Sequence, residues 1–202
     1  MPASFTEKIT SLTKQLAQLL SANNRFMATA ESCTGGWIAQ SLTALPGSSA
    51  WFDSGFVTYS NAAKQRLLNV PANLFAEEGP GAVSEETVLA MTAGAIANSE
   101  ADVAVAVSGV AGPDGGSEEK PVGTVWIAWQ VGEVADAHCF NFPGDREAAA
   151  HGCGSGVYNG KQSVVASACE IDIQFQIAPA GCIQYHAVTD LLYLNALYVR
   201  QV

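Results

Sequence analysis

The stretch Arg25-Phe-Met-Ala-Thr-Ala-Glu-Ser-Cys-Thr-Gly-Gly36 indicates the type of fold. Its first half, residues 25–30, is a short apolar run that predicts a strand. A Gly-Gly turn follows, and residues 34–45 favour a helix that ends before Pro46-Gly47. A strand that passes through a glycine turn into a helix is typical of layered α/β proteins.

The sequence on either side continues this alternation. Ser4 and Glu7 form a capping box for an N-terminal helix whose apolar residues recur at helical spacing up to Leu20. Ser84 predicts the start of another helix. Further strands are expected at residues 51–59, 102–108, 122–131 and 134–142, and a short helix at residues 61–68. The order predicts an α/β domain with a mixed sheet that ends in a hairpin.

Composition narrows the function classes. The chain has 202 residues, which suits one domain or one domain with an extension. Its 9 Lys and Arg residues against 19 Asp and Glu residues give a net charge of −10, which argues against general binding of nucleic acid or anionic membrane. No run of 18 apolar residues predicts a membrane span. An anionic ligand would therefore need local backbone donors or a few placed cations.

The thiol and imidazole groups give no metal or disulfide pattern. The five cysteines contain no Cys-x-x-Cys pair, and the three histidines lack metal-ligand spacing. Residues 1–13 do not resemble a signal peptide. We therefore expect a cytoplasmic protein with free thiols, no metal and no cofactor. These residues are Cys33, Cys139, Cys153, Cys169 and Cys182, and His138, His151 and His186.

Two glycine-rich loops follow predicted strands. In the loop of residues 31–36, Ser32 and Thr34 offer hydroxyl groups, and the following helix N-terminus favours an anion. The alternative is an ordinary strand-to-helix turn. Residues 108–116 form the second loop, for which the alternative is a mobile surface loop. Neither loop is a Walker A motif. The charged residues 118–120 are interpreted as a solvated turn.

Serine and lysine supply a possible nucleophile and base. Gly47-Ser-Ser49 stands near Tyr59 and Lys64 in the sequence. A serine hydroxyl needs a base to take its proton, and lysine can serve if burial or a cation keeps it neutral. The alternative for Lys64 is a solvated surface residue. Cys33, beside a predicted helix start, is a rival nucleophile, with a small buried side chain as its alternative.

Seven ordered blocks over about residues 5–148 resemble the CinA C-terminal domain family, and are most similar to its stand-alone nicotinamide-nucleotide amidases. Their number and order make the resemblance far more specific than a single glycine loop. The blocks are Ala28-Thr-Ala-Glu-Ser-Cys-Thr-Gly-Gly36, Pro46-Gly-Ser-Ser-Ala50, Gly55-Phe-Val-Thr-Tyr-Ser-Asn61, Gly81-Ala-Val-Ser84, Ser108-Gly-Val-Ala-Gly-Pro-Asp-Gly-Gly-Ser117, Lys120-Pro-Val-Gly-Thr124 and Gly144-Asp-Arg146.

The resemblance implies a three-layer α/β/α fold and an enzyme of pyridine nucleotide salvage. Such an enzyme converts nicotinamide mononucleotide into nicotinic acid mononucleotide and ammonia. The resemblance further implies a metal-independent serine–lysine mechanism, no cofactor, and assembly into a homo-oligomer.

Residue roles follow from the same resemblance. Ser49 is the implied nucleophile, with the adjacent Ser48 as the alternative, Lys64 is the base, and Tyr59 assists or orients it. Arg146 would pair with the substrate phosphate. The implied substrate-binding set is Ser32, Thr34, Gly35, Gly36, Ser48, Ser108, Gly109 and Arg146.

The chain departs from the family pattern after Gly144-Asp-Arg146. Where the family continues into a closing helix, residues 151–202 hold only five charged side chains. We therefore expect an amidase domain at residues 1–150 and an atypical, poorly ordered tail at residues 151–202 that is not the family's native C-terminus. Two other functions stay open: an inactive ligand-binding or assembly module, and an amidase for a different small amide.

Overall fold

The computed structural model of the chain describes residues 5–112 and 115–141. The predicted helix cap Ser4, the predicted phosphate ligand Arg146 and the predicted tail at residues 151–202 lie outside these ranges.

A five-stranded mixed sheet forms the middle of the molecule, in the order β2-β1-β3-β4-β5. β1 lies parallel to both β2 and β3, whereas β4 runs antiparallel to β3 and to β5. The prediction of a mixed sheet that ends in a hairpin is confirmed. The strands are β1 (Met27–Glu31), β2 (Phe52–Val57), β3 (Val103–Gly109), β4 (Thr124–Val131) and β5 (Val134–Asn141).

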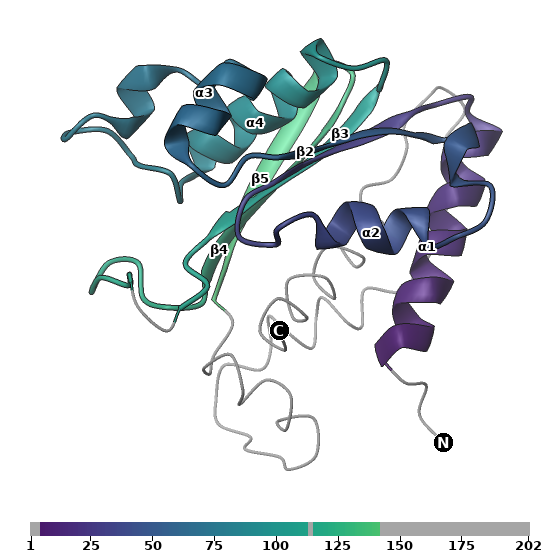
Figure 1. Ribbon diagram of the computed structural model, residues 1–202, viewed down its shortest axis with the longest axis horizontal. Coiled ribbons are helices and arrows are strands. Elements are labelled where there is room, and N and C mark those ends of the chain that lie inside the picture. Colours follow the sequence, from purple (N-terminus) through teal and green to yellow (C-terminus); the bar gives the residue numbers. More distant parts are fainter. Residues whose placement is uncertain (1–4, 113–114, 142–202) are drawn as a thin grey trace.

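Helices cover both faces of this sheet. Figure 1 shows α1 and α2 on one face and α3 and α4 on the other, which confirms the predicted three-layer α/β/α fold. Two short 3-10 helices lie in the connections. The helical bounds are α1 (Phe5–Ala22), α2 (Trp37–Thr43), η1 (Ser48–Ala50), α3 (Asn61–Leu68), η2 (Ala72–Phe75) and α4 (Glu85–Ala97).

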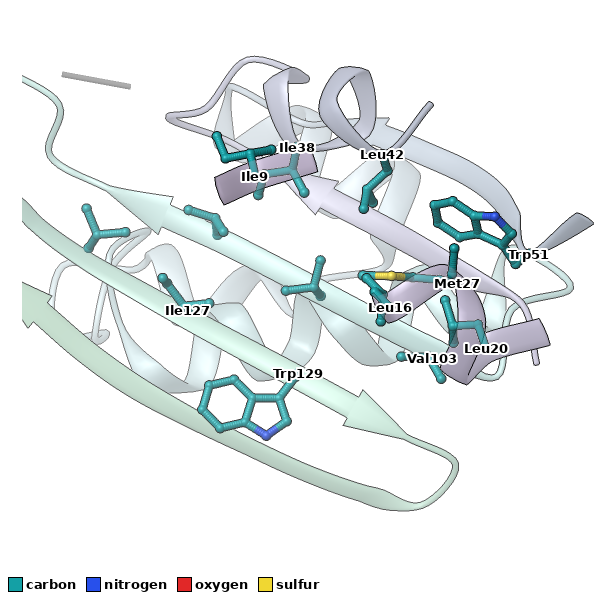
Figure 2. Close-up of a cluster of buried hydrophobic side chains, with 14 residues drawn as sticks. Ile9, Leu16, Leu20, Met27, Ile38, Leu42, Trp51, Val103, Ile127 and Trp129 are labelled. Atoms are coloured by element: carbon teal, nitrogen blue, oxygen red, sulfur yellow. The ribbon is translucent and has the colours of Figure 1, made fainter. Parts of the chain in front are cut away.

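The face under α1 and α2 is filled by large apolar side chains. Leu16 and Leu20 of α1 and Leu42 of α2 are fully buried against Met27 of β1 and Trp51 (Figure 2). Each fully buried side chain of this size contributes about 1.5–3 kcal/mol through the water it sheds. This cluster fixes the α1–α2 layer on the sheet.

The face under α4 is lined instead by alanine. Ala28 and Ala30 of β1 lie beside Ala104 and Ala106 of β3, and all four are fully buried. Small side chains let a helix approach the sheet closely. Because side chains alternate between faces along a strand, the next position on this face after Ala30 is Ser32, and after Ala106 it is Ser108. Each alanine row therefore ends in a serine.

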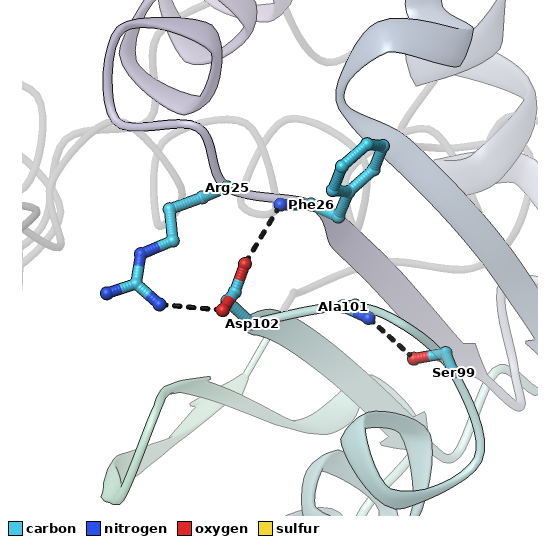
Figure 3. Close-up of polar contacts among 5 residues, drawn as sticks. All are labelled: Arg25, Phe26, Ser99, Ala101 and Asp102. Atoms are coloured by element: carbon cyan, nitrogen blue, oxygen red, sulfur yellow. Dashed lines mark hydrogen bonds and ion pairs between the residues drawn. The ribbon is translucent and has the colours of Figure 1, made fainter.

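An ion pair joins the starts of β1 and β3. One guanidinium nitrogen of Arg25 lies 2.6 Å from a carboxylate oxygen of Asp102, whose other oxygen accepts a hydrogen bond from the backbone N–H of Phe26 (Figure 3). The backbone N–H of Asp102 in turn donates to the carbonyl of Phe26. These contacts hold the two strands in register at the edge opposite the serines.

Candidate active site

Ser32 and Ser108 lie side by side where two parallel strands end. The last paired residues before them are Glu31 of β1 and Val107 of β3, and the backbone N–H of Ser32 donates to the carbonyl of Val107. Neighbouring strands are about 4.8 Å apart. Both serines are more than nine-tenths buried. In open α/β sheets the carboxyl ends of the strands are the usual place for a ligand. This end of the sheet, where Ser32 and Ser108 lie, is the serine edge.

Lys64 reaches this edge from α3. Its side chain is only 1% exposed, and its Nζ donates hydrogen bonds to Ser32 Oγ at 2.8 Å, to the Thr58 carbonyl at 2.8 Å and to the Tyr59 carbonyl at 3.2 Å. Burial lowers the pKa of Lys64 to about 8, against an opposing effect of the nearby Cys33 thiol. Lys64 is therefore not a solvated surface residue.

The three contacts of Lys64 suit a base that works in the neutral form. An amine keeps two N–H bonds and one lone pair. If the carbonyls of Thr58 and Tyr59 accept those two N–H bonds, the lone pair faces the hydroxyl of Ser32. The serine hydroxyl can then donate its proton to Lys64, which is the arrangement that activates a serine nucleophile.

Glu31 caps α2 with a buried carboxylate. The side chain is 1% exposed and accepts hydrogen bonds from the backbone N–H groups of Gly36, Ile38 and Ala39 and from the Thr29 hydroxyl. The carboxylate thus takes the place at the helix N-terminus where an anionic ligand was expected. The prediction that this terminus binds the anion is wrong, because its amides already have an anionic partner.

The start of α2 also differs from the predicted helix at residues 34–45. Gly35 and Gly36 adopt positive φ angles of 63° and 99°, which lie outside the helical region, so α2 begins at Trp37. An added Cβ at Gly36 would lie 3.1 Å from Val57 Cγ2, whereas the space around Gly35 is open. Gly36 therefore serves the turn itself, and only Gly35 leaves room for a ligand.

Two buried hydroxyl groups at the same edge have no hydrogen-bond partner within the described chain. They belong to Thr34, which is 8% exposed, and to Thr58, which is fully buried. An unpaired buried polar group costs about 1–3 kcal/mol. The Thr34 hydroxyl, in the turn after Ser32, is well placed to bond to a ligand, in keeping with its predicted role.

Ser48 and Ser49 lie at the opposite end of the strands from Ser32 and Ser108. Both are in η1, which precedes β2, whereas Lys64 contacts Thr58 just after β2 ends. The strand between them is about 16 Å long. Within one chain the predicted Ser49–Lys64 pair is therefore not formed, because Lys64 is hydrogen-bonded to Ser32 instead.

Tyr59 contacts Lys64 through its backbone rather than its phenol. Its carbonyl oxygen accepts a hydrogen bond from Lys64 Nζ, and its side chain is 72% exposed. The predicted role of Tyr59 in assisting or orienting Lys64 stays a prediction, and the contact that the structure shows runs through the main chain. The exposed aromatic ring of Tyr59 offers a face for stacking.

Ser108 anchors the loop before α4. Its hydroxyl donates to the Ala82 carbonyl at 2.7 Å. The next residue, Gly109, has no room for a side chain, since an added Cβ would lie 2.7 Å from Val125 Cγ2 and 2.9 Å from the Thr124 carbonyl. Gly109 is therefore fixed by the close approach of β4, and a role in substrate binding is restricted to its backbone.

Lys120 binds the same loop before α4 that Ser108 binds. Its Nζ donates to the Pro80 carbonyl at 2.6 Å, and its side chain is half-buried. The interpretation of residues 118–120 as a solvated turn is correct for the exposed Glu118 and Glu119 but wrong for Lys120. A single lysine between exposed residues gives no periodic signal, so the sequence could not place it.

The likeness to known proteins agrees with this geometry. The family model described as "CinA C-terminal domain" matches residues 9–156.

The chain belongs to the CinA C-terminal domain family.

Relatives of this CinA chain carry names that state an activity. A nicotinamide-nucleotide amidohydrolase PncC of Pseudomonas putida is 57% identical over 142 residues, which cover 70% of this chain and 88% of that protein. The protein of the same name from Escherichia coli (strain K12) is 51% identical over 144 residues, covering 70% and 85%. The crystal structure of a competence/damage inducible protein from Agrobacterium tumefaciens has a TM-score of 0.66, 42% identity and 70% and 86% coverage.

Cys33 does not have the properties of a nucleophile in this CinA domain. Burial raises the pKa of its thiol to about 12, although the nearby Lys64 and the local backbone act in the opposite direction. A thiol attacks as the thiolate, so Cys33 stays unreactive near neutral pH. It packs against the core under α1 and α2, in agreement with its alternative as a small buried side chain.

The described residues form neither a grouped metal-ligand set nor a membrane-spanning helix. Within residues 5–112 and 115–141, no three His, Cys, Asp or Glu side chains are grouped so as to hold a metal ion. The helices of this part are too short or too polar to cross a membrane.

Proposed function

We propose that this chain hydrolyses the carboxamide of nicotinamide mononucleotide to nicotinic acid mononucleotide and ammonia. The names of the PncC relatives, at 51–57% identity over most of their length, support the substrate and the reaction. The observation that carries the proposal is the hydrogen bond from Lys64 to Ser32, because it joins a nucleophile to a base of lowered pKa in a buried site.

In the proposed reaction Ser32 is the nucleophile, in place of Ser49. Ser32 Oγ attacks the carboxamide carbon while its proton passes to Lys64 Nζ. At pH 7 a lysine of pKa about 8 is neutral in roughly a tenth of molecules, whereas an ordinary lysine is neutral in fewer than one in a thousand. The lowered pKa therefore makes the base available hundreds of times more often.

The tetrahedral intermediate then collapses. Protonated Lys64 returns the proton to the amide nitrogen, the C–N bond breaks, and ammonia leaves an ester between Ser32 and the nicotinoyl group. A water molecule, deprotonated by the same lysine, attacks this ester. The C–O bond to Ser32 breaks, Lys64 returns the proton to Ser32 Oγ, and the carboxylic acid that leaves ionises to the carboxylate product. One water is consumed and one ammonia released, and no step requires a metal ion or cofactor.

Other residues around the serine support this scheme as proposed ligands. The Thr34 hydroxyl, which is buried without a described partner, is proposed to bond to the carboxamide, and Gly35 leaves space beside it. Tyr59 is proposed to stack on the pyridine ring from its exposed position. Ser108 is proposed to shape the pocket floor beside Ser32. Arg146, outside the described ranges, stays a predicted phosphate ligand.

The predicted domain division and assembly keep their status as proposals. The family match runs to residue 156, slightly beyond the expected boundary at residue 150. A cytoplasmic homo-oligomer is proposed because the substrate is an intracellular nucleotide and because the resemblance implies assembly. Sedimentation of the purified chain tests the assembly directly.

The test of the function is ammonia release from nicotinamide mononucleotide by the purified chain with a chelator present. We expect release that equals the nicotinic acid mononucleotide formed and that chelation does not reduce. Release that stops with the chelator and returns on addition of zinc would reject the metal-independent scheme. No release by a folded sample would reject the activity and favour the inactive binding module.

A further inference from the structure

The proposed substrate brings a phosphate group to a strongly acidic chain. Three helices begin at the serine edge of the sheet, where a phosphate would ordinarily find free amides. The first amides of α2 are occupied by the Glu31 carboxylate. Side-chain oxygens cap the other two, from Ser60 in α3 and Ser84 in α4, and α4 adds two acidic residues in its first turn. Each serine occupies one amide only, so these helix starts keep some free donors, but a cationic side chain is the stronger partner for a phosphate.

Lys120 is the described cation best placed to supply that charge. Of the other lysine and arginine side chains with described surroundings, Lys64 is bonded to Ser32 and Arg25 is paired at the opposite end of the strands. Lys14 is exposed on α1, and Arg66 is exposed in the last turn of α3, away from the helix start at the serines. Lys120 is held at the serine edge by the Pro80 carbonyl. That bond uses one of the three N–H donors of its ammonium group, and no other described residue forms a hydrogen bond or ion pair with it.

The loop at residues 80–82 places Lys120 near Ser108. Pro80 accepts from Lys120, and Ala82, two residues later, accepts from Ser108. Two residues span at most about 7 Å. An added Cβ at Gly81, between them, would lie 4.0 Å from Lys120 Nζ. Lys120 and Ser108 are thus tied to the same three-residue segment.

The order of the strands separates the two lysines. At the level of Ser32 the neighbouring positions across the sheet are Ser108, Trp126 and Cys139. Lys120 lies close enough to Cys139 for its charge to lower the pKa of that thiol, although burial has the larger, raising effect. From Ser32 to Cys139 is three strand spacings, about 15 Å. Lys64 thus lies at the β1 side of the Ser32–Ser108 pair, and Lys120 is tied to the β3 side, toward β4 and β5.

We infer that the Lys120 ammonium binds the phosphate of the substrate and so determines the preference for a nucleotide over the corresponding nucleoside. This inference rests on the proposed function. With the carboxamide at Ser32 and Lys64, the ribose lies over Ser108 and the phosphate meets the two remaining N–H donors of Lys120. The carbonyl of Pro80 keeps the ammonium in place before the ligand arrives.

The competing explanation is that Lys120 only ties down the loop at residues 80–82. Substrates with and without the phosphate separate the two explanations, because a loop defect affects both. The experiment measures kcat/KM of the full chain for nicotinamide mononucleotide and for nicotinamide riboside. It compares the unaltered chain with Lys120→Met, Lys120→Arg and, as a control for lost charge, Lys14→Met.

We expect Lys120→Met to lower the ratio of the two kcat/KM values at least about tenfold, through KM for the nucleotide, because a charge-assisted hydrogen bond is lost. Lys120→Arg should retain most of the preference and Lys14→Met all of it. Equal losses on both substrates, or an unchanged ratio, would overturn the inference in favour of the loop role.

Calorimetric binding of ribose 5-phosphate gives a readout that does not depend on catalysis. We expect binding by the unaltered chain that weakens at least about tenfold in Lys120→Met. Equal binding by both, or no binding by the unaltered chain, overturns the inference. If ribose 5-phosphate binds through Lys120 but ammonia is released from neither substrate, the proposed function fails and the phosphate site remains.

Discussion

Lys64 Nζ lies 2.8 Å from Ser32 Oγ, although the lysine belongs to the helical layer and the serine to the end of a central strand. The contact joins residues 32 positions apart in sequence. It exists because α3 begins directly after β2, so that its first turn lies over the end of the neighbouring β1. The geometry of the site thus depends on both layers.

Replacement of Ser32 by alanine should abolish activity. Loss of a serine nucleophile lowers kcat by at least about 10³-fold, and Lys64→Met should cause a loss of similar size because the pair acts as a unit. Ser49→Ala is the matched comparison, and we expect less than a threefold change. Ammonia release per active protomer is the measurement. A severe loss in Ser49→Ala with an active Ser32→Ala would restore Ser49 as the nucleophile.

The rate should depend on pH through Lys64. The base works in the neutral form, so kcat/KM should rise with pH, bend near pH 8 and level off above it. Burial is the cause of the lowered pKa, since it disfavours the charged form. Initial rates between pH 6 and 10 in a constant-ionic-strength buffer test this. A profile that is flat over this range would exclude Lys64 as the base.

The titration of Lys64 should also make the free energy of unfolding depend on pH. The pKa of Lys64 is about 8 in the folded chain and ordinary, near 10.5, in the unfolded chain, so the unfolded chain binds more protons between these values. The free energy of unfolding from Lys64 therefore rises as pH increases from about 8 to 10.5. Cys33, whose thiol pKa is raised, acts in the reverse direction above pH 9. The measurement is thus the difference between the unaltered chain and Lys64→Met in urea, which should widen with pH in favour of the unaltered chain.

Removal of the Glu31 carboxylate should destabilise the fold. Four donors lose their acceptor in Glu31→Ala, and three of them are amides at the start of α2. We expect the free energy of unfolding to fall by about 3 kcal/mol. Glu85→Gln, an exposed change in the first turn of α4, should cost less than about 1 kcal/mol. Denaturant titration compares the two, and similar losses would contradict the assigned role.

Gly94 should not tolerate alanine, although it lies inside a helix. Alanine ordinarily stabilises a helix relative to glycine by about 1 kcal/mol. Here an added Cβ would overlap the Leu68 carbonyl at the contact of α4 with α3. We expect Gly94→Ala to lower the free energy of unfolding by at least about 2 kcal/mol. The exposed neighbour gives the reverse control, since Ala93→Gly should cost only about 1 kcal/mol. A neutral Gly94→Ala would show that the helices separate easily.

The order of helices and strands could be predicted because each one has a local signal. Ser84, predicted as a helix cap, accepts from the Thr87 amide, and the apolar run at residues 102–108 is a buried strand. The bounds of α2 were less predictable. Its start depends on the Glu31 carboxylate and on two glycines at positive φ, which are features of a folded turn rather than of periodicity.

The partners within the site could be predicted less well than its members. Sequence reasoning and the family resemblance selected Lys64, Ser32, Thr34 and Ser108, all of which lie at one edge of the sheet. The same reasoning paired Lys64 with Ser49, which lies before β2, whereas Lys64 contacts the residue that follows β2. Which serine contacts the lysine depends on strand order and helix placement. The spacing of the motifs predicts neither.

The alanine rows that end in Ser32 and Ser108 limit where this sequence can gain or lose a residue. One residue inserted within β1 would turn Ser32 to the opposite face of the sheet and bring a neighbour into its place, because side chains alternate along a strand. The same shift would bring the bulky Met27 side chain toward the alanine-lined face and take the Glu31 carboxylate away from the start of α2, so the core and the nucleophile would be lost together. An insertion at Gly132, in the exposed turn between β4 and β5, leaves that alternation intact. Length changes should therefore accumulate in that turn and be absent from β1.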